Sequence, residues 1–219
     1  MAVPLSVVLV SGGLDSCVAA ALAVCQGEVA FLHLNYRQRT ERRELAAFAA
    51  IANHYGVERR LVVDISFLQD IGGSSLIDRA LPVPEGDPEG VPSTYVPFRN
   101  ANLLGIAVAW AEVLGAGQVY IGAHEEESHY PDCRAPFFAA YNRMIAEGIK
   151  PGFPIQVQTP LIALDKGGIV QRGLELQAPL HLTWSCYQRE DLACGRCHSC
   201  RLRLQGFARA GLADPLAYC

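Results

Sequence analysis

The 219-residue sequence has no excess of positive charge, no long hydrophobic run, and no internal repeat or low-complexity segment. Its formal net charge is −4, and this disfavours a general nucleic-acid binder, because such proteins carry a basic surface. The longest apolar stretch, residues 103–110, is too short to cross a bilayer. The N-terminal apolar run stops at Ser11 and follows no basic region, so it does not resemble a signal peptide. We therefore expect a cytoplasmic protein that binds neither membranes nor nucleic acid.

The composition is typical of a folded globular protein. Hydrophobic residues make up 51% of the chain and charged residues 18%, which is enough apolar surface for a substantial core. Disulfides are not expected among the eight cysteines, because an intracellular compartment keeps thiols reduced. Four of the cysteines lie together near the C-terminus.

Strand and helix patterns alternate along the first 180 residues. Short apolar, β-branched runs predict strands at residues 5–10, 29–36, 59–65, 119–123 and 155–161. Helices are predicted at residues 14–26, 41–55, 100–116, 137–147 and 166–176. This alternation predicts an α/β fold with a doubly wound, parallel, five-stranded sheet that binds ligands at the carboxyl ends of its strands.

Two segments interrupt the alternation. Residues 66–97 are rich in glycine and proline and too long for a simple connector, so we expect a lid or a binding loop there. Residues 181–219 contain the cysteine cluster. We expect residues 1–180 to form the α/β domain and residues 181–219 to form a small metal-binding segment packed on it.

The turn "SGGLDS", residues 11–16, lies between the first predicted strand and the first predicted helix. Its glycines let the backbone approach a ligand, and amides at a helix N-terminus favour an anion. Asp15 would repel phosphate unless a Mg²⁺ ion lay between them. A simple helix cap is the alternative interpretation, and a Walker A loop is excluded because its Lys-Ser/Thr pair is missing. We interpret the turn as a phosphate-binding site.

Four cysteines at C-x₇-C-x₂-C-x₂-C spacing indicate a metal site. They are Cys186, Cys194, Cys197 and Cys200. Four thiolates form a closed tetrahedral zinc site, which is typically structural. An iron–sulfur cluster is the alternative, because it uses similar cysteine spacings.

Two further segments place polar residues near the predicted ligand edge. Arg99 lies at the start of a predicted helix, where it could meet an anion or remain a surface residue. After the fourth strand, Tyr130, Asp132 and Arg134 offer an aromatic ring, a pair of acceptors and a cation. An ion pair between Asp132 and Arg134 is the purely structural alternative.

"SGGLDS" resembles the pyrophosphate-binding loop of the PP-loop enzymes, which cleave ATP to AMP and pyrophosphate while adenylating a substrate oxygen. Together with "NYRQR", "STYVPFRN", "YPDCR", "TPLIALDK", "TWSCY" and "CGRCHSCRLR", it makes nearly the whole chain similar to the 7-cyano-7-deazaguanine synthase family. The chain departs from that family at His129 and Phe98, where glycine is usual.

The resemblance implies a ligase that forms carbon–nitrogen bonds in queuosine biosynthesis. Such an enzyme converts 7-carboxy-7-deazaguanine and ammonia to the nitrile through an adenylated acid and an amide, and it uses ATP twice. The resemblance also implies Mg²⁺ bound with ATP, one structural Zn²⁺ ion and a homodimer. The ammonia would arrive free or from a partner.

The same resemblance implies roles for particular residues. Asp15, Ser16 and Lys166 are the expected catalytic residues, with Asp15 holding Mg²⁺ on the departing pyrophosphate. ATP is expected to contact Val10, Ser11, Gly12, Gly13, Leu14, Asp15, Ser16, Cys17, Val18, Ala19, Ala20 and Arg99. The deazaguanine is expected to contact Tyr130, Asp132 and Arg134, with Asp132 accepting from the N1–H and 2-amino groups.

Three other functions fit parts of the sequence. A PP-loop enzyme that modifies tRNA directly would need an RNA-binding surface, and the acidic chain offers no evident one. A diverged relative could act on another carboxylate or join two proteins. A zinc-binding module without enzyme activity would have no use for Asp15 in an intact phosphate loop.

Overall fold

Five parallel strands form the centre of the computed structural model, which describes residues 4–87, 89–125 and 129–219. The strands are β1 (Leu5–Leu9), β2 (Glu28–Asn35), β3 (Arg60–Asp64), β4 (Gln118–Tyr120) and β5 (Gln156–Gln158). Their order is β3-β2-β1-β4-β5, so the chain fills one side of β1 and then the other. This confirms the predicted doubly wound sheet, and its switch point lies beside β1.

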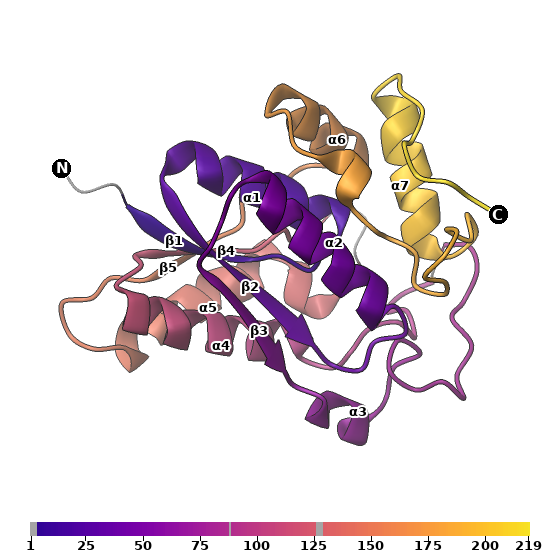
Figure 1. Ribbon diagram of the computed structural model, residues 1–219. Coiled ribbons are helices and arrows are strands. Elements are labelled where there is room, and N and C mark those ends of the chain that lie inside the picture. Colours follow the sequence, from indigo (N-terminus) through magenta and orange to yellow (C-terminus); the bar gives the residue numbers. More distant parts are fainter. Residues whose placement is uncertain (1–3, 88, 126–128) are drawn as a thin grey trace.

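Helices cover both faces of the sheet (Figure 1). One face carries α1 (Leu14–Gln26) and α2 (Glu41–His54), and α6 (Lys166–Glu175) packs on α1. The other face carries α4 (Arg99–Leu114) and α5 (Ala135–Gly148). None of the helices in the described ranges combines the length and apolarity that a bilayer span needs.

The core explains why β1 is apolar at every position except Ser6, which is itself buried. Val7 and Leu9 face the cluster beneath α4 and α5, whereas Val8 and Val10 face the cluster beneath α1 and α2. A strand with helices on both sides buries both rows of side chains, so it has no polar face. The small side chains of α1, such as Ala19 and Ala20, are fully buried and let that helix lie close to its neighbours.

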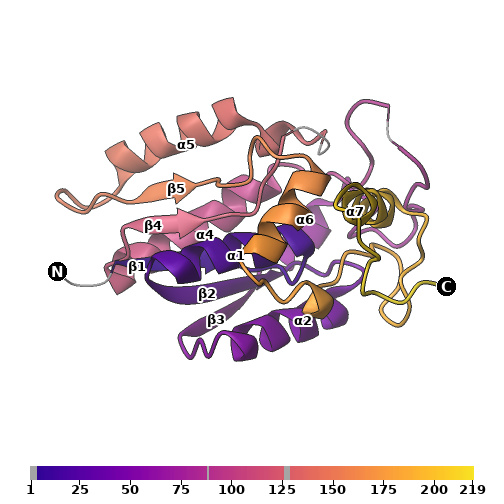
Figure 2. The ribbon, with the colours of Figure 1, turned by 90° about the horizontal axis from the view of Figure 1, so that it is seen from above.

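The predicted strands at 119–123 and 155–161 are too long. β4 ends at Tyr120 and β5 at Gln158, and residues 121–124 leave the sheet to pass over the start of α1. Two helices were not predicted, α3 (Phe67–Ile71) and α7 (His198–Arg209). α7 begins directly after Cys197 and lies beside α6, as Figures 1 and 2 show.

The long segment at residues 66–97, described except for residue 88, contacts the C-terminal segment. Glu85 forms an isolated antiparallel bridge with Cys197, and the N–H of Gly86 donates to the carbonyl oxygen of Arg196 at 3.4 Å. At its start, the segment is held by Arg39, whose Nε donates to the carbonyl oxygen of Ser75 at 2.6 Å. The segment therefore follows a defined path between α2 and the cysteine cluster.

Candidate active site

A cavity of about 250 Å³ lies at the carboxyl ends of β1, β2 and β4. Three parts of the chain line it: the loop at residues 11–16, the residues that follow β2 and β4 together with the start of α4, and the C-terminal segment around Trp184 and Arg203. The predicted phosphate loop therefore lies in a cavity at the switch point of the sheet, where an α/β fold binds ligands.

The backbone of the loop requires glycine at position 12. Gly12 has a φ of +88°, and a Cβ there would lie 2.5 Å from the carbonyl oxygen of Glu44. The oxygen of Gly12 accepts from the backbone N–H of Trp184 at 2.9 Å. Close packing on α2 and on the C-terminal segment therefore fixes the loop from two sides.

Serine hydroxyls hold the loop from within. Ser16 Oγ donates to the carbonyl oxygen of Gly13 at 3.0 Å and accepts from the N–H of Ser11 at 3.2 Å. Gly13 is the N-cap of α1 and has no side chain to cap that helix end, and its own N–H donates to Ser11 Oγ at 3.2 Å. The N-terminal amides of α1 thus face the cavity, as an anion site requires.

Asp15, Lys166 and His124 meet at the centre of the site. Lys166 Nζ lies 2.8 Å from both carboxylate oxygens of Asp15 and 3.1 Å from His124 Nε2. Burial alone would raise the pKa of Asp15, but the charge and hydrogen bonds of Lys166, together with His124 and Arg203, outweigh that effect and lower the pKa. The Asp15 carboxylate is therefore ionised and paired with the side chain of Lys166, beside the loop at residues 11–16.

Two glycines allow this contact between distant parts of the chain. A Cβ on Gly122, after β4, would lie 2.6 Å from the backbone carbon and oxygen of Asp15. A Cβ on Gly206, in α7, would lie 2.6 Å from Lys166 Cγ and 2.8 Å from its backbone oxygen. The position of Asp15 relative to Lys166 therefore depends on close backbone packing by β4 and α7.

The expected ATP-binding residues divide into two groups. Seven line the cavity: Val10, Ser11, Gly13, Leu14, Asp15, Ser16 and Arg99. Cys17, Val18, Ala19 and Ala20 are buried within α1, away from the described cavity wall, and Gly12 faces α2. Burial raises the pKa of the Cys17 thiol to about 12, so that thiol stays protonated.

Of the three expected substrate residues, the structure brings only Tyr130 to the cavity. Asp132 is buried in a short 3₁₀ turn (Pro131–Cys133), where its Oδ2 accepts from the backbone N–H of Asn100 at 2.9 Å. Arg134 is exposed, and its Nε donates to the carbonyl oxygen of Pro131 at 3.3 Å. Within the described ranges, no ion pair joins Asp132 to Arg134, so the structural alternative is also absent.

Several residues that line the cavity were not identified from the sequence: Tyr36, Glu44, His124, Trp184, Tyr187 and Arg203. Tyr36 follows β2, and its hydroxyl accepts from Arg99 Nη1 at 2.8 Å. His124 is the first polar side chain after β4, which was a usable signal because polar residues at that edge meet the ligand. Arg203 gave no such signal, since it is buried in α7 and its Nε lies 2.8 Å from Asp214.

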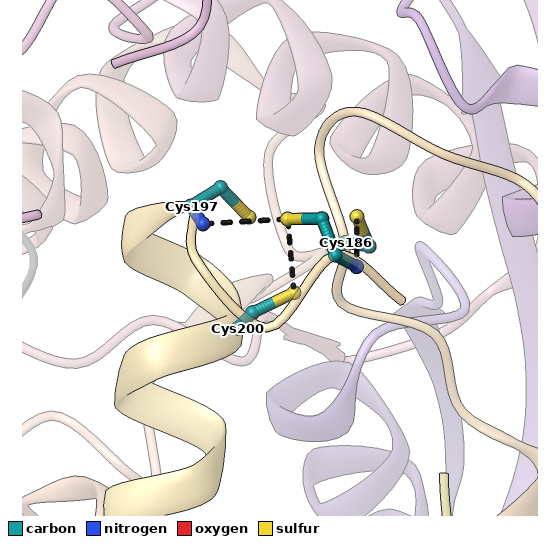
Figure 3. A group of neighbouring side chains, drawn as sticks. Cys186, Cys197 and Cys200 are labelled. Atoms are coloured by element: carbon teal, nitrogen blue, oxygen red, sulfur yellow. Dashed lines mark hydrogen bonds between the residues drawn. The ribbon is translucent and has the colours of Figure 1, made fainter. Parts of the chain in front are cut away.

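The four cysteines of the C-terminal segment form one buried cluster. Their Sγ atoms all lie within 4.8 Å of one another, and those of Cys194 and Cys200 are 3.9 Å apart. A tetrahedral ion with metal–sulfur bonds of about 2.3 Å holds its sulfur atoms about 3.8 Å apart. Figure 3 shows the thiols of Cys186, Cys197 and Cys200 pointing toward one another. The donor set and spacing therefore fit a four-thiolate metal site.

Backbone amides support the same assignment. The N–H of Cys194 donates to Cys186 Sγ at 3.4 Å, and the N–H of Cys197 donates to Cys194 Sγ at 3.3 Å. Such bonds stabilise negative charge on sulfur, which metal-bound thiolates carry. Gly195, with a φ of +69°, provides the tight turn that brings these amides to the sulfur atoms.

The chain is similar to known proteins over nearly its whole length. A family model described as "Queuosine biosynthesis protein QueC" matches residues 5–211. The 7-cyano-7-deazaguanine synthases of Chlorobaculum parvum and Chlorobaculum tepidum are each 54% identical to it over 217 residues, which is 97% of this chain and 96% of theirs. Among solved structures, the U34-tRNA thiolase NcsA from Methanococcus maripaludis aligns with a TM-score of 0.45 and 16% identity, over 82% of this chain and 59% of that one. A structural likeness that weak carries no argument about function.

Proposed function

The chain belongs to the QueC family of queuosine biosynthesis proteins, and we infer from this that it works as a 7-cyano-7-deazaguanine synthase, an ATP-dependent ligase. A carboxylate oxygen of 7-carboxy-7-deazaguanine attacks the α-phosphorus of ATP, and pyrophosphate leaves. Ammonia then displaces AMP to give the amide and releases one proton. The amide oxygen attacks the α-phosphorus of a second ATP, and pyrophosphate leaves again. Departure of AMP with two further protons then leaves the nitrile.

The loop at residues 11–16 supports this proposal because its donors suit a pyrophosphate leaving group. The amides at the start of α1 and the hydroxyls of Ser11 and Ser16 would bind its oxygens. Lys166 would stabilise the charge that develops on the α-phosphate. The single observation that carries the proposal is the contact of Lys166 with Asp15 at the mouth of this loop.

We propose two roles for Asp15. It orients Lys166 through the two 2.8 Å contacts, and it would hold Mg²⁺ when ATP is bound. Mg²⁺ bound with ATP neutralises charge on the pyrophosphate. A carboxylate whose pKa is lowered stays ionised at neutral pH, as both roles require. Its side chain is 24% exposed, so it remains accessible from the cavity.

We propose that the four-cysteine cluster holds one structural Zn²⁺ ion. Four sulfur atoms this close together suit a single ion. In an iron–sulfur cluster the cysteine sulfur atoms lie farther apart, because they bind different iron atoms. The same segment supplies Trp184, Tyr187 and Arg203 to the cavity wall, so zinc would stabilise one side of the active site.

We propose that Asp132 positions Asn100 at the start of α4 rather than contacting the base. Its carboxylate already accepts the N–H of Asn100, and its backbone oxygen accepts from Asn100 Nδ2 at 2.9 Å. Tyr130 remains the candidate for stacking on the base, because it lines the cavity and its hydroxyl lies 2.9 Å from Thr94 Oγ1. A homodimer is also proposed, and light scattering on the purified protein would test it.

The test is a turnover assay. The protein would be incubated with ATP, ammonia and 7-carboxy-7-deazaguanine, and the products followed by mass spectrometry. We expect the nitrile, with two AMP formed for each nitrile. Turnover of a different carboxylate, or modification of added tRNA with no nitrile formed, would instead favour a diverged relative or a tRNA-modifying enzyme.

A further inference from the structure

The cavity contains a second carboxylate that the proposed chemistry leaves unused. Among the described lining residues the carboxylates are Asp15 and Glu44, and Asp15 is held by Lys166. Glu44 lies in the first turn of α2. Since Asp132 does not line the cavity, the group that recognises the hydrogen-bonding edge of the base is still to be assigned. The inference below rests on the function proposed above.

Glu44 is held in one orientation. Its Oε1 accepts from Thr40 Oγ1 at 2.7 Å, and its Oε2 accepts from Gln38 Nε2 at 3.0 Å. Each carboxylate oxygen can accept two hydrogen bonds, so each retains capacity for a ligand. The backbone oxygen of Glu44 packs against Gly12, which fixes α2 relative to the phosphate loop. The carboxylate is therefore oriented before any substrate arrives.

Keeping this carboxylate partly buried costs stability. Burial raises the pKa of Glu44, although the hydrogen bonds from Thr40 and Gln38 and the charge of Arg99 act in the opposite direction. An acidic side chain with a raised pKa is less favourable in the folded protein than in water at neutral pH. Such unfavourable placements are common at functional sites. The amide oxygen of a glutamine would accept the same hydrogen bond from Thr40 without the free-energy cost of burying a charge.

The chemistry of the two substrates decides what Glu44 can recognise. A 7-deazaguanine presents N1–H and the 2-amino group as two adjacent donors, which one carboxylate can accept together. The adenine of ATP presents one amino donor beside an acceptor nitrogen, so a carboxylate facing its edge would gain one bond and suffer one repulsion. A partly buried carboxylate therefore selects the deazaguanine over the nucleotide base.

We propose that Glu44 is the specificity-determining residue that accepts the N1–H and 2-amino hydrogen bonds of 7-carboxy-7-deazaguanine. The 7-carboxyl group lies on the five-membered ring, at the opposite end of the base from the 2-amino group. A base bound at Glu44 thus directs its carboxyl group away from α2. The same cavity contains Lys166, beside the expected α-phosphate.

The experiment compares wild type with Glu44→Gln on two substrates. One is 7-carboxy-7-deazaguanine, and the other is the same molecule without its 2-amino group. We expect wild type to prefer the natural acid by about 100-fold or more in kcat/KM, because the analogue cannot donate the second hydrogen bond that the Glu44 carboxylate would accept from the base. Glu44→Gln should reduce this preference to below about 10-fold, while the KM for ATP changes by less than about threefold.

Glu41→Gln is the matched control. Glu41 lies in the same turn of α2, but its Oε2 accepts from the N–H of Arg37 at 3.0 Å and it does not line the cavity. This variant should keep the wild-type preference. Melting temperature and ATP binding report on folding, and if Glu44→Gln does not fold, Glu44→Asp replaces it. Asp keeps the charge but shortens the reach, so it should also weaken the preference.

Two results would overturn the proposal. If Glu44→Gln folds and keeps the wild-type preference, Glu44 only holds Thr40 and Gln38. If the KM for ATP rises while that for the acid is unchanged, Glu44 contacts the nucleotide instead. Failure of the proposed function is a separate outcome, because wild type would then not convert the natural acid at all.

Discussion

Replacing Gly122 with alanine tests whether the position of Asp15 sets the rate of the reaction. Gly122 follows β4 and lines the cavity, and its backbone φ lies outside the left-handed region. The added methyl group would meet the backbone carbon and oxygen of Asp15 at 2.6 Å and the N–H nitrogen of Ser16 at 2.7 Å. The substitution therefore acts through this contact and not through backbone strain.

The expected magnitude follows from these distances. Carbon atoms in contact lie about 3.5–4.0 Å apart, so the backbone of Asp15 must retreat by about 1 Å. Such a shift would stretch the 2.8 Å contacts with Lys166 beyond hydrogen-bond length. A misplacement of that size costs about 100-fold in rate. Overpacking also costs about 1–3 kcal/mol of stability, which lowers the Tm of a chain this long by about 2–4 °C for each kcal/mol.

The assay measures kcat/KM for nitrile formation and the thermal unfolding of both proteins. Gly148→Ala is the control, because Gly148 is the last residue of α5 and a Cβ there meets nothing within 4 Å. It should keep full activity and leave the Tm unchanged or slightly raised. Wild-type activity in Gly122→Ala, together with an unchanged Tm, would refute the claim that close packing by β4 positions Asp15.

Three further predictions concern other parts of the site. Asp15→Asn should keep the fold but lose ATP-dependent turnover, and wild-type turnover would contradict the roles given to Asp15. Cys197→Ser should lower both the zinc content, measured by elemental analysis, and the Tm; iron with a visible absorption band in wild type would contradict zinc. Burial and the nearby charge of Glu41 raise the pKa of Glu44 against the opposing effects of Thr40, Gln38 and Arg99, so the folded protein holds that proton more tightly than the unfolded chain. Lowering the pH from about 8 to about 5 should therefore raise the Tm of wild type relative to Glu44→Gln, and a constant difference would contradict this assignment.

The sheet was predictable because the apolar pattern of each strand can be read from its own residues, without knowledge of its neighbours in the fold. Residues 5–10 are apolar except for Ser6, and residues 29–36 are apolar except for His33 and Asn35; burial on both faces favours that pattern. The tight turn at residues 11–16 was predictable for a similar local reason, since only glycine fits at position 12. The contact between Lys166 and Asp15 joins residues 151 positions apart, and the family resemblance implied only that both act in catalysis.

Asp132 shows where this kind of prediction fails. Its position after β4 correctly placed it near the ligand edge of the sheet, but position does not determine which way a side chain points. The backbone N–H of Asn100, in the first turn of α4, needs an acceptor because helix starts leave their amides unpaired. Asp132 supplies that acceptor at 2.9 Å, and its carboxylate turns away from the cavity. Glu44 was overlooked for the opposite reason, because a glutamate near a helix start is usually a solvated residue.

The cysteine cluster was predicted as a metal site, but its place in the wall of the active site was not. Val83, from the long segment at residues 66–97, packs in one buried cluster with Trp184 and the four cysteines. Gln188 Nε2 donates to the carbonyl oxygen of Val83 at 3.3 Å, and Trp184 donates its backbone N–H to Gly12 in the phosphate loop. The metal-binding segment thus contacts both the long segment and the phosphate loop. A metal bound there would stabilise the geometry of the cavity as well as the fold, which would account for a four-cysteine cluster in a chain that already has a sizeable core.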